Sequence, residues 1–288
     1  MKLVTYELHG DGRLGAVRDQ VIVDLTAVAP DMLSLIESGA AGLAQAEAYA
    51  QTASPALRLA EATLLAPIPV PRRNVMCLGL NYVEHAQESY TARGQETKIP
   101  DFPIVFTKAT TAVTGPYAPI PYNPHVSAKI DWEAEMAVII GRRGKNISPE
   151  EAMGYIFGYT IINDVSARDL QTQHKQYFKG KSLDGSCPMG PWIVTADEIP
   201  DPHNLNITSR VNGVTKQASN TRHMIFNLPA IIYHLSRGMT LLPGDIIATG
   251  TPSGVGFARQ PPEFLAPGDV VACEVEGLGL IRNPIASE

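Results

Sequence analysis

Four acidic side chains stand at spacings that suit a metal site. Asp131, Glu133 and Glu135 alternate along the chain, and Asp164 directly follows an apolar stretch. In a β-strand, residues two apart point to the same face, so a strand over residues 131–141 would carry its three acids together. The second half of this strand is fully apolar and is predicted to enter a core. Carboxylates at the edge of a core repel one another, and a divalent cation would relieve that repulsion.

The ligand types in this acidic set indicate which metal would bind. Carboxylate oxygens without cysteine suit Mg²⁺, Mn²⁺ or Ca²⁺ better than Zn²⁺. We therefore expect Mg²⁺ or Mn²⁺ as the cofactor, with Ca²⁺ able to replace them in crystals. The alternative is a strand whose acidic face is solvated, because such alternation is ordinary in half-exposed strands. Residues 131–135 alone leave both interpretations open.

A histidine and a glutamate on one predicted helix could supply a base. Asn81 is predicted to cap this helix, with Glu84 completing a capping box. His85 and Glu88 are three residues apart, so the carboxylate can orient the imidazole as a base that activates water. The alternative is an ion pair on an exposed helix surface. Residues 90–103 lack periodicity and are predicted to form a loop or lid.

Further polar residues could bind an anionic substrate. Arg168 and Gln171 follow Asp164 by four and seven residues, a spacing that would place them on its face of a helical turn. Lys181 lies in a glycine-bracketed run, and residues 249–256 form a glycine- and hydroxyl-rich loop. Cations and amides beside carboxylates suit a negatively charged carbon acid at a metal. A structural ion-pair cluster and a tight structural turn are the respective alternatives.

Composition excludes several classes of protein. The chain has 288 residues, 44% hydrophobic and 18% charged, which is typical of a globular protein with a large core. A net charge of −6 without a basic cluster argues against a nucleic-acid partner. Cys77, Cys187 and Cys273 are widely spaced and are expected to be reduced thiols. The early polar residues and the lack of a long apolar run predict no membrane partner and a cytoplasmic location.

The chain is predicted to divide at a proline-rich linker. Residues 1–66 contain strand-like segments and two short helices, and we expect them to form a small β-rich N-terminal domain. Residues 67–73 form the linker, because alternating prolines favour an extended connection. Residues 74–288 carry every candidate site residue and are predicted to form the catalytic domain.

Five motifs resemble, in order, those of the fumarylacetoacetate hydrolase family, over roughly residues 70–285. They are Gly79-Leu80-Asn81-Tyr82-x-x-His85, Asp131-x-Glu133-x-Glu135, Asn163-Asp164-x-Ser166-Ala167-Arg168-Asp169-x-Gln171, Gly180-Lys181-Ser182 and Thr249-Gly250-Thr251-Pro252-Ser253-Gly254. The resemblance implies an α+β, β-rich fold built as a mixed β-sandwich roll, and a homodimer. It also implies that Mg²⁺ or Mn²⁺ is held by Glu133, Glu135 and Asp164.

The resemblance also assigns roles around the metal. His85 and Glu88 would sit on a lid that closes over the substrate. The pocket would be lined by Arg168, Gln171, Lys181 and Thr251. Asp131 matches no metal ligand of the family, so we expect Asp131→Ala to keep both metal and activity.

These features predict a metal-dependent enzyme that hydrolyses a C–C bond in a 2,4-diketo acid of the acylpyruvate or fumarylpyruvate type. The metal would act as a Lewis acid, His85 with Glu88 would activate water, and Lys181 would stabilise the oxyanion. Alternatives within the family are decarboxylation of oxaloacetate and isomerisation or decarboxylation of hydroxymuconate-type diacids. A binding or scaffolding protein without turnover is the alternative from another class, and the presence of all the catalytic residue types argues against it.

Overall fold

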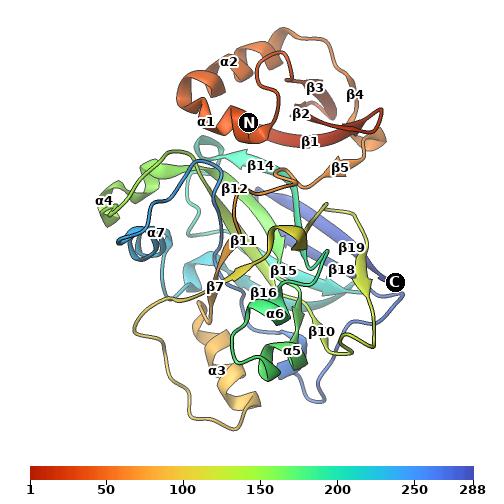
Figure 1. The fold of residues 1–288 in the computed structure, drawn as a ribbon, viewed down its shortest axis with the longest axis vertical. Coiled ribbons are helices and arrows are strands. Elements are labelled where there is room, and N and C mark those ends of the chain that lie inside the picture. The colour runs from red at the N-terminus through yellow and green to blue at the C-terminus, as the bar shows by residue number, and fades with distance from the viewer.

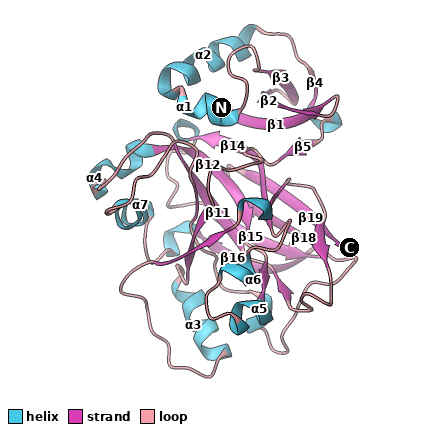
Figure 2. Cartoon of the chain, viewed as in Figure 1, coloured by secondary structure: helices cyan, strands magenta, loops and turns pink.

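Two β-sheets with peripheral helices make up the computed structural model, which describes residues 1–288 (Figures 1 and 2). The large sheet contains β1 (Lys2–Leu8), β2 (Asp11–Arg18), β3 (Val21–Asp24), β4 (Leu57–Arg58), β5 (Leu64–Leu65), β6 (Val75–Gly79), β7 (Ile104–Lys108), β8 (Val113–Thr114), β11 (Ala134–Ile140), β12 (Ile156–Asn163), β14 (Cys187–Thr195) and β17 (Ile246–Ala248). The second sheet contains β9 (Ile120–Tyr122), β15 (Asn206–Val211), β16 (Val214–Asn220), β18 (Val270–Val275) and β19 (Gly279–Ser287). A separate short pair joins β10 (Ile130–Asp131) to β13 (Ser166–Ala167).

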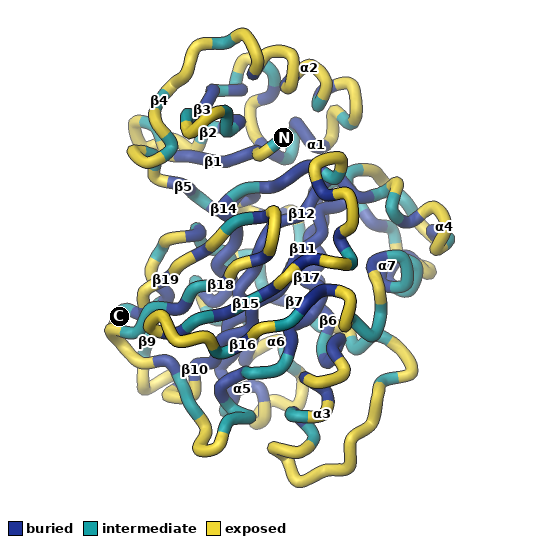
Figure 3. Tube along the Cα trace, turned by 180° about the vertical axis from the view of Figure 1, so that it is seen from behind, coloured by how far each residue is buried: buried dark blue, intermediate teal, exposed yellow.

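Seven α-helices lie around the sheets. They are α1 (Met32–Glu37), α2 (Gly39–Thr52), α3 (Val83–Ala92), α4 (Pro149–Ala152), α5 (Arg168–Gln173), α6 (Phe178–Lys181) and α7 (Leu228–Ser236). None of them has the length and apolar composition needed to cross a membrane. The segment between α3 and β7 contains most of the predicted lid and is largely exposed, whereas β11 and β12 are buried (Figure 3).

The core lies between the two sheets, and β11 and β12 run through it. Every residue of both strands is buried, because their apolar runs have packed neighbours on both faces. Both strands contact β18 of the second sheet, so one continuous core joins the two layers. The predicted α+β, β-rich sandwich is therefore confirmed.

The N-terminal segment continues the large sheet. β1 pairs antiparallel with β14, with Leu3 opposite Ile193. The linker lies against this segment, because Thr5 Oγ1 donates to the Pro67 carbonyl oxygen at 2.8 Å and Ile68 is buried in a core shared with residues of both parts. The division into residues 1–66, 67–73 and 74–288 stays a prediction.

Two predicted elements differ in the structure because side chains replace backbone partners. The predicted strand over residues 131–141 is interrupted between β10 and β11, where Glu133 N donates to Asn163 Oδ1 at 3.0 Å. Asn81 does not cap α3; its side chain instead donates to the Thr249 carbonyl oxygen and exchanges hydrogen bonds with the Phe226 backbone. The capping box was therefore wrong, and Asn81 joins the start of α3 to two distant segments.

Asp24 at the end of β3 is the centre of a polar network in the N-terminal segment. Its carboxylate accepts hydrogen bonds from Tyr6 Oη at 2.6 Å and Arg13 Nε at 2.5 Å, and from the Thr26 hydroxyl and backbone N–H. Partial burial alone would raise the pKa of Asp24, but these hydrogen bonds outweigh it and lower the pKa below its ordinary value. The charged form of Asp24 is thus favoured by folding.

We expect Asp24→Asn to destabilise the protein at pH 7 and to lose this effect in acid. Because the folded-state pKa lies below that of the unfolded chain, Asp24 stabilises the protein above about pH 4, and the contribution is lost as the pH falls further. Urea unfolding of wild type and variant between pH 7 and pH 3 measures this. Asp11→Asn is the control, since the exposed Asp11 side chain has no hydrogen-bond partner. A difference between wild type and Asp24→Asn that is constant with pH would contradict the argument.

Candidate active site

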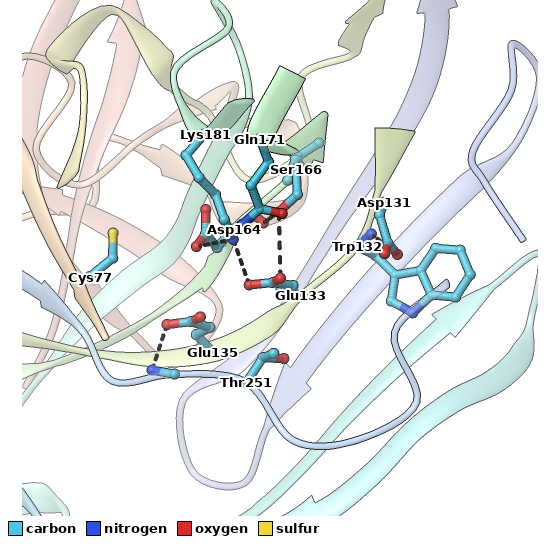
Figure 4. A network of polar contacts seen from close by, with 12 residues as sticks. Cys77, Asp131, Trp132, Glu133, Glu135, Asp164, Ser166, Gln171, Lys181 and Thr251 are labelled. Carbon is cyan, nitrogen blue, oxygen red and sulfur yellow. Dashed lines mark hydrogen bonds and ion pairs between the residues drawn. The ribbon is translucent and has the colours of Figure 1, made fainter. Parts of the chain in front are cut away.

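The three predicted metal ligands come together where β11 and β12 meet. These strands pair antiparallel with Ala134 opposite Asn163, so the start of one lies beside the end of the other. Glu133, Glu135 and Asp164 each offer a carboxylate oxygen, and these atoms lie within 4.8 Å of one another (Figure 4). All three residues are buried, which rules out the alternative of a solvated acidic face.

Two buried lysines neutralise part of this charge. Lys181 Nζ donates to Glu133 Oε2 at 2.8 Å and to Asp164 Oδ2 at 2.7 Å. Lys108 Nζ, at the end of β7, donates to Asp164 Oδ1 at 2.7 Å. Sequence analysis missed Lys108. The other residues of β7 are half-buried or exposed, so the local sequence offered no signal that Lys108 is buried with a carboxylate partner.

Burial and neighbouring charge shift the pKa values of Glu133 and Glu135 in opposite directions. Burial alone would raise the pKa of Glu133, but Lys181 and Arg168 overcome this and lower it to about 2. Burial, together with repulsion from Asp164 and Glu133, raises the pKa of Glu135 well above its ordinary value. Burial would lower the pKa of Lys181, but the two carboxylates beside it raise that pKa instead. Glu135 is thus the acid that the protein's own cations compensate least.

The carboxylate oxygen of Glu135 that has no hydrogen-bond partner is suited to bind a divalent cation. Its Oε2 atom accepts a hydrogen bond from Gly250 N at 2.7 Å, whereas Oε1 is buried without a hydrogen-bond partner. A closed ion-pair cluster would satisfy both oxygens, since an unpaired buried carboxylate oxygen is costly. Three carboxylates with one oxygen unpartnered form a set of hard oxygen donors that suits Mg²⁺ or Mn²⁺.

The predicted base lies on α3 and is held from two directions. His85 Nδ1 is 2.8 Å from Glu88 Oε1, and Glu88 Oε2 accepts a hydrogen bond from Gly254 N at 2.8 Å. With a proton on Nδ1 shared with Glu88, the other ring nitrogen, Nε2, is the proton acceptor. His85 is buried, so the alternative of an exposed surface pair does not apply.

Arg168 and Gln171 reach the site from α5, in a different way from that predicted. The helix begins at Arg168, so Asp164 lies before it and is not on the same helical turn. Arg168 NH1 donates to Gln171 Oε1 at 3.2 Å, and its NH2 lies 2.7 Å from Glu133 Oε1. The residues between Asp164 and Arg168 form β13, which pairs with β10 and prevents a helical turn there.

The hydroxyl of Thr251 already forms two hydrogen bonds within the protein. Its Oγ1 donates to the Ala134 carbonyl oxygen at 2.8 Å and accepts from Gln217 Nε2 at 2.7 Å. The glycine-rich loop is therefore tied to β11, which explains part of its sequence as a structural turn. The predicted contact of Thr251 with substrate stays a prediction.

A pocket of about 370 Å³, including its opening, joins most of these groups. Its wall includes His85, Glu133, Arg168, Gln171, Lys181 and Thr251. Glu88, Glu135 and Asp164 are not part of that wall. They lie behind it, where Glu88 contacts His85, Asp164 contacts Lys181, and Glu135 lies beside Glu133. Six of the residues predicted from separate motifs therefore meet at one pocket.

Comparison with known proteins identifies the family. Residues 74–286 match the family model described as fumarylacetoacetate (FAA) hydrolase, C-terminal. The chain belongs to the fumarylacetoacetate hydrolase family. Members of this family are metal-dependent enzymes, and this family member is an enzyme of that kind.

Three relatives of this fumarylacetoacetate hydrolase family member cover nearly all of it. Oxaloacetate tautomerase YisK of Bacillus subtilis (strain 168) is 43% identical over 304 residues, covering 99% of this chain and 100% of that protein. A fumarylacetoacetate hydrolase from the psychrophilic Exiguobacterium antarcticum has a TM-score of 0.83 at 39% identity, covering 100% of both chains. Maleylpyruvate hydrolase from Sphingobium sp. SYK-6, in complex with manganese(II) ion and pyruvate, has a TM-score of 0.81 at 30% identity, covering 100% of this chain and 99% of that chain.

Asp131 has a place in this family member that its sequence did not suggest. Its buried carboxylate accepts hydrogen bonds from Arg168 Nε at 2.8 Å, Gly256 N at 2.7 Å, Phe257 N at 3.0 Å and Trp132 N at 2.8 Å. Asp131 lies apart from the three metal ligands (Figure 4). It therefore binds no metal with them but joins Arg168 to the loop that follows β17. The expectation that Asp131→Ala keeps the metal stays a prediction, whereas these hydrogen bonds lead us to expect reduced activity.

We expect Glu135→Gln to weaken metal binding without destabilising the metal-free protein. The substitution removes a buried carboxylate that no protein cation contacts, and the loss in affinity should exceed the roughly 10–100-fold typical of outer-shell partners. Mn²⁺ titration and thermal unfolding in chelator measure the two effects. Glu133→Gln is the matched control, because it breaks ion pairs with Lys181 and Arg168 and should lower the melting temperature in chelator. Equal melting temperatures for the two variants in chelator would refute this distinction.

We expect Asp131→Asn to impair substrate binding while Mn²⁺ affinity stays near that of wild type. Removing one partner of a buried ion pair costs about 3–5 kcal/mol, and it leaves Arg168 with Glu133 as its remaining carboxylate partner. Substrate KM and Mn²⁺ affinity should be measured separately. Asp169→Asn on the same helix is a control outside the pocket wall, since Asp169 contacts Ser127 and no pocket residue. Loss of Mn²⁺ affinity in Asp131→Asn equal to that in a ligand variant would show that Asp131 belongs to the metal site.

Proposed function

We propose that this enzyme interconverts the keto and enol forms of oxaloacetate, or of a closely similar 2-keto acid, with a divalent cation at Glu133, Glu135 and Asp164. The observation that carries the proposal is a buried carboxylate triad, one member of which, Glu133, lines the same pocket as an oriented histidine and a charged lysine. The Bacillus subtilis relative, which is named an oxaloacetate tautomerase and matches this chain over 99% of its length, supports the choice of substrate.

Tautomerisation moves a proton from the carbon beside the keto group to the keto oxygen. The negative charge that develops on that oxygen must be stabilised, and a divalent cation bound by Glu133, Glu135 and Asp164 would supply the Lewis acidity for this. Lys181 adds a second positive charge at the pocket wall. Because its pKa is raised by Asp164 and Glu133, Lys181 stays protonated and acts as a charge and not as the base.

His85 is the group best placed to take the carbon-bound proton. Its Nδ1 faces Glu88, so its Nε2 is free to accept a proton and to return it to the oxygen or the carbon. The bond from Gly254 N to Glu88 fixes the orienting carboxylate as well. The chain therefore has one base, one fixed charge and one metal site, which are the groups that a proton transfer next to a keto acid requires.

Hydrolysis of a C–C bond in an acylpyruvate is the second candidate. The same His85–Glu88 pair could activate water, and the relative named maleylpyruvate hydrolase, with a TM-score of 0.81, supports this chemistry. Decarboxylation of oxaloacetate proceeds through the enolate but needs no base, so it gives His85 no role in forming the enolate. The homodimer and the cytoplasmic location that we expected from the sequence stay predictions.

We expect His85→Gln to lower kcat for tautomerisation by about 10²–10⁴-fold, the usual contribution of a positioned proton-transfer group. Mn²⁺ affinity should not change, and chelator should abolish the wild-type activity. Decay of enol-oxaloacetate absorbance measures the tautomerisation, and acetylpyruvate cleavage measures the hydrolysis in parallel. His125→Gln is the control, because His125 lies in an exposed turn and its side chain makes no hydrogen bond. A His85→Gln enzyme within a few-fold of wild type would exclude His85 as the base.

A further inference from the structure

The pocket wall contains three permanently charged cations, and two of them are already neutralised. Arg168 pairs with Asp131 and Glu133. Lys181 pairs with Glu133 and Asp164. The third cation, Arg93, also lines the pocket but forms no ion pair or hydrogen bond through its guanidinium group. Arg93 therefore carries the positive charge of the pocket that remains available to an anion.

Arg93 is placed at the opposite end of α3 from the proton-transfer group. His85 and Ser89 are four residues apart and lie on one face of the helix, and Arg93 follows its last residue as the C-cap. All three side chains line the same pocket. Arg93 is exposed, whereas His85 and Glu133 are buried, so the pocket runs from the triad to a positively charged mouth.

An aromatic ring keeps this guanidinium near the pocket without neutralising it. Arg93 lies over the ring of Phe257, 5.7 Å from its centre, and Arg168 lies over the same ring at 4.5 Å. A cation above an aromatic face is held in place while its N–H groups stay free for an acceptor. Phe257 N is in turn bound to Asp131 at 3.0 Å, which ties the ring to the framework of the site.

We propose that Arg93 binds the distal carboxylate of the substrate, and that the enzyme is therefore selective for 2-keto dicarboxylates. This inference rests on the proposed function, since it assumes that the keto-acid end of the substrate lies at the triad. A planar guanidinium matches a carboxylate with two parallel hydrogen bonds, so it distinguishes a dicarboxylate from a neutral analogue of the same shape. The lid helix thus carries both the base and the specificity determinant.

The test compares oxaloacetate with its 4-methyl ester, which retains the keto–enol chemistry and lacks the distal charge. Arg93→Gln should lower kcat/KM for oxaloacetate by about tenfold or more, as expected for loss of a hydrogen bond to a charged group, and leave that for the ester unchanged. Arg93→Lys should recover part of the selectivity. Arg142→Gln is the matched control, because Arg142 also lies over an aromatic ring, Tyr155 at 3.8 Å, but is not part of the pocket wall.

The outcomes separate this inference from the proposed function. If the wild type turns over both compounds and Arg93→Gln changes them equally or not at all, Arg93 does not bind the distal carboxylate. If the wild type turns over neither, the proposed function fails. Calorimetric binding of the same two compounds in Mg²⁺ then decides the inference alone: tighter binding of oxaloacetate that Arg93→Gln abolishes supports it, and equal binding overturns it.

Discussion

The burial of three carboxylates in one place is the constraint on which the rest of this structure depends. The antiparallel pairing of β11 with β12 brings Glu133, Glu135 and Asp164 within 4.8 Å. Like charges so close and so deeply buried are stable only with compensating cations. Lys108 and Lys181 supply part of the compensation from distant segments, and the unpartnered oxygen of Glu135 is where a divalent cation would supply more.

Ion pairs with buried carboxylates also fix the position of Arg168 at the pocket wall. Arg168 is shared between Glu133 and Asp131, so a residue that faces the pocket also belongs to the buried ion-pair network. Asp131 in turn holds the backbone of Gly256 and Phe257, and with it the loop beneath the lid. The carboxylate triad, Arg168 and this loop are therefore one connected unit, in which a change to one member leaves another charge with fewer partners.

The lid helix is fixed at its start and exposed at its end. Asn81 joins the start of α3 to Phe226 and Thr249, and Glu88 joins the next turns to Gly254. Beyond Arg93 the chain is exposed until β7. This attachment suits the predicted lid, because His85 is held in place while the chain beyond the far end of the helix is exposed.

Local spacing by itself determined the metal and base candidates in this protein. Strand and helix periodicity relate Glu133 to Glu135 and His85 to Glu88, and these pairs were predicted because both partners are a few residues apart. The partners of Lys108 and Asp131 depended on tertiary structure, since Asp164, Arg168 and Gly256 lie 37 or more residues away from the side chain that each contacts. Sequence spacing carries no information about such contacts, because only the pairing of distant strands decides which buried charge meets which.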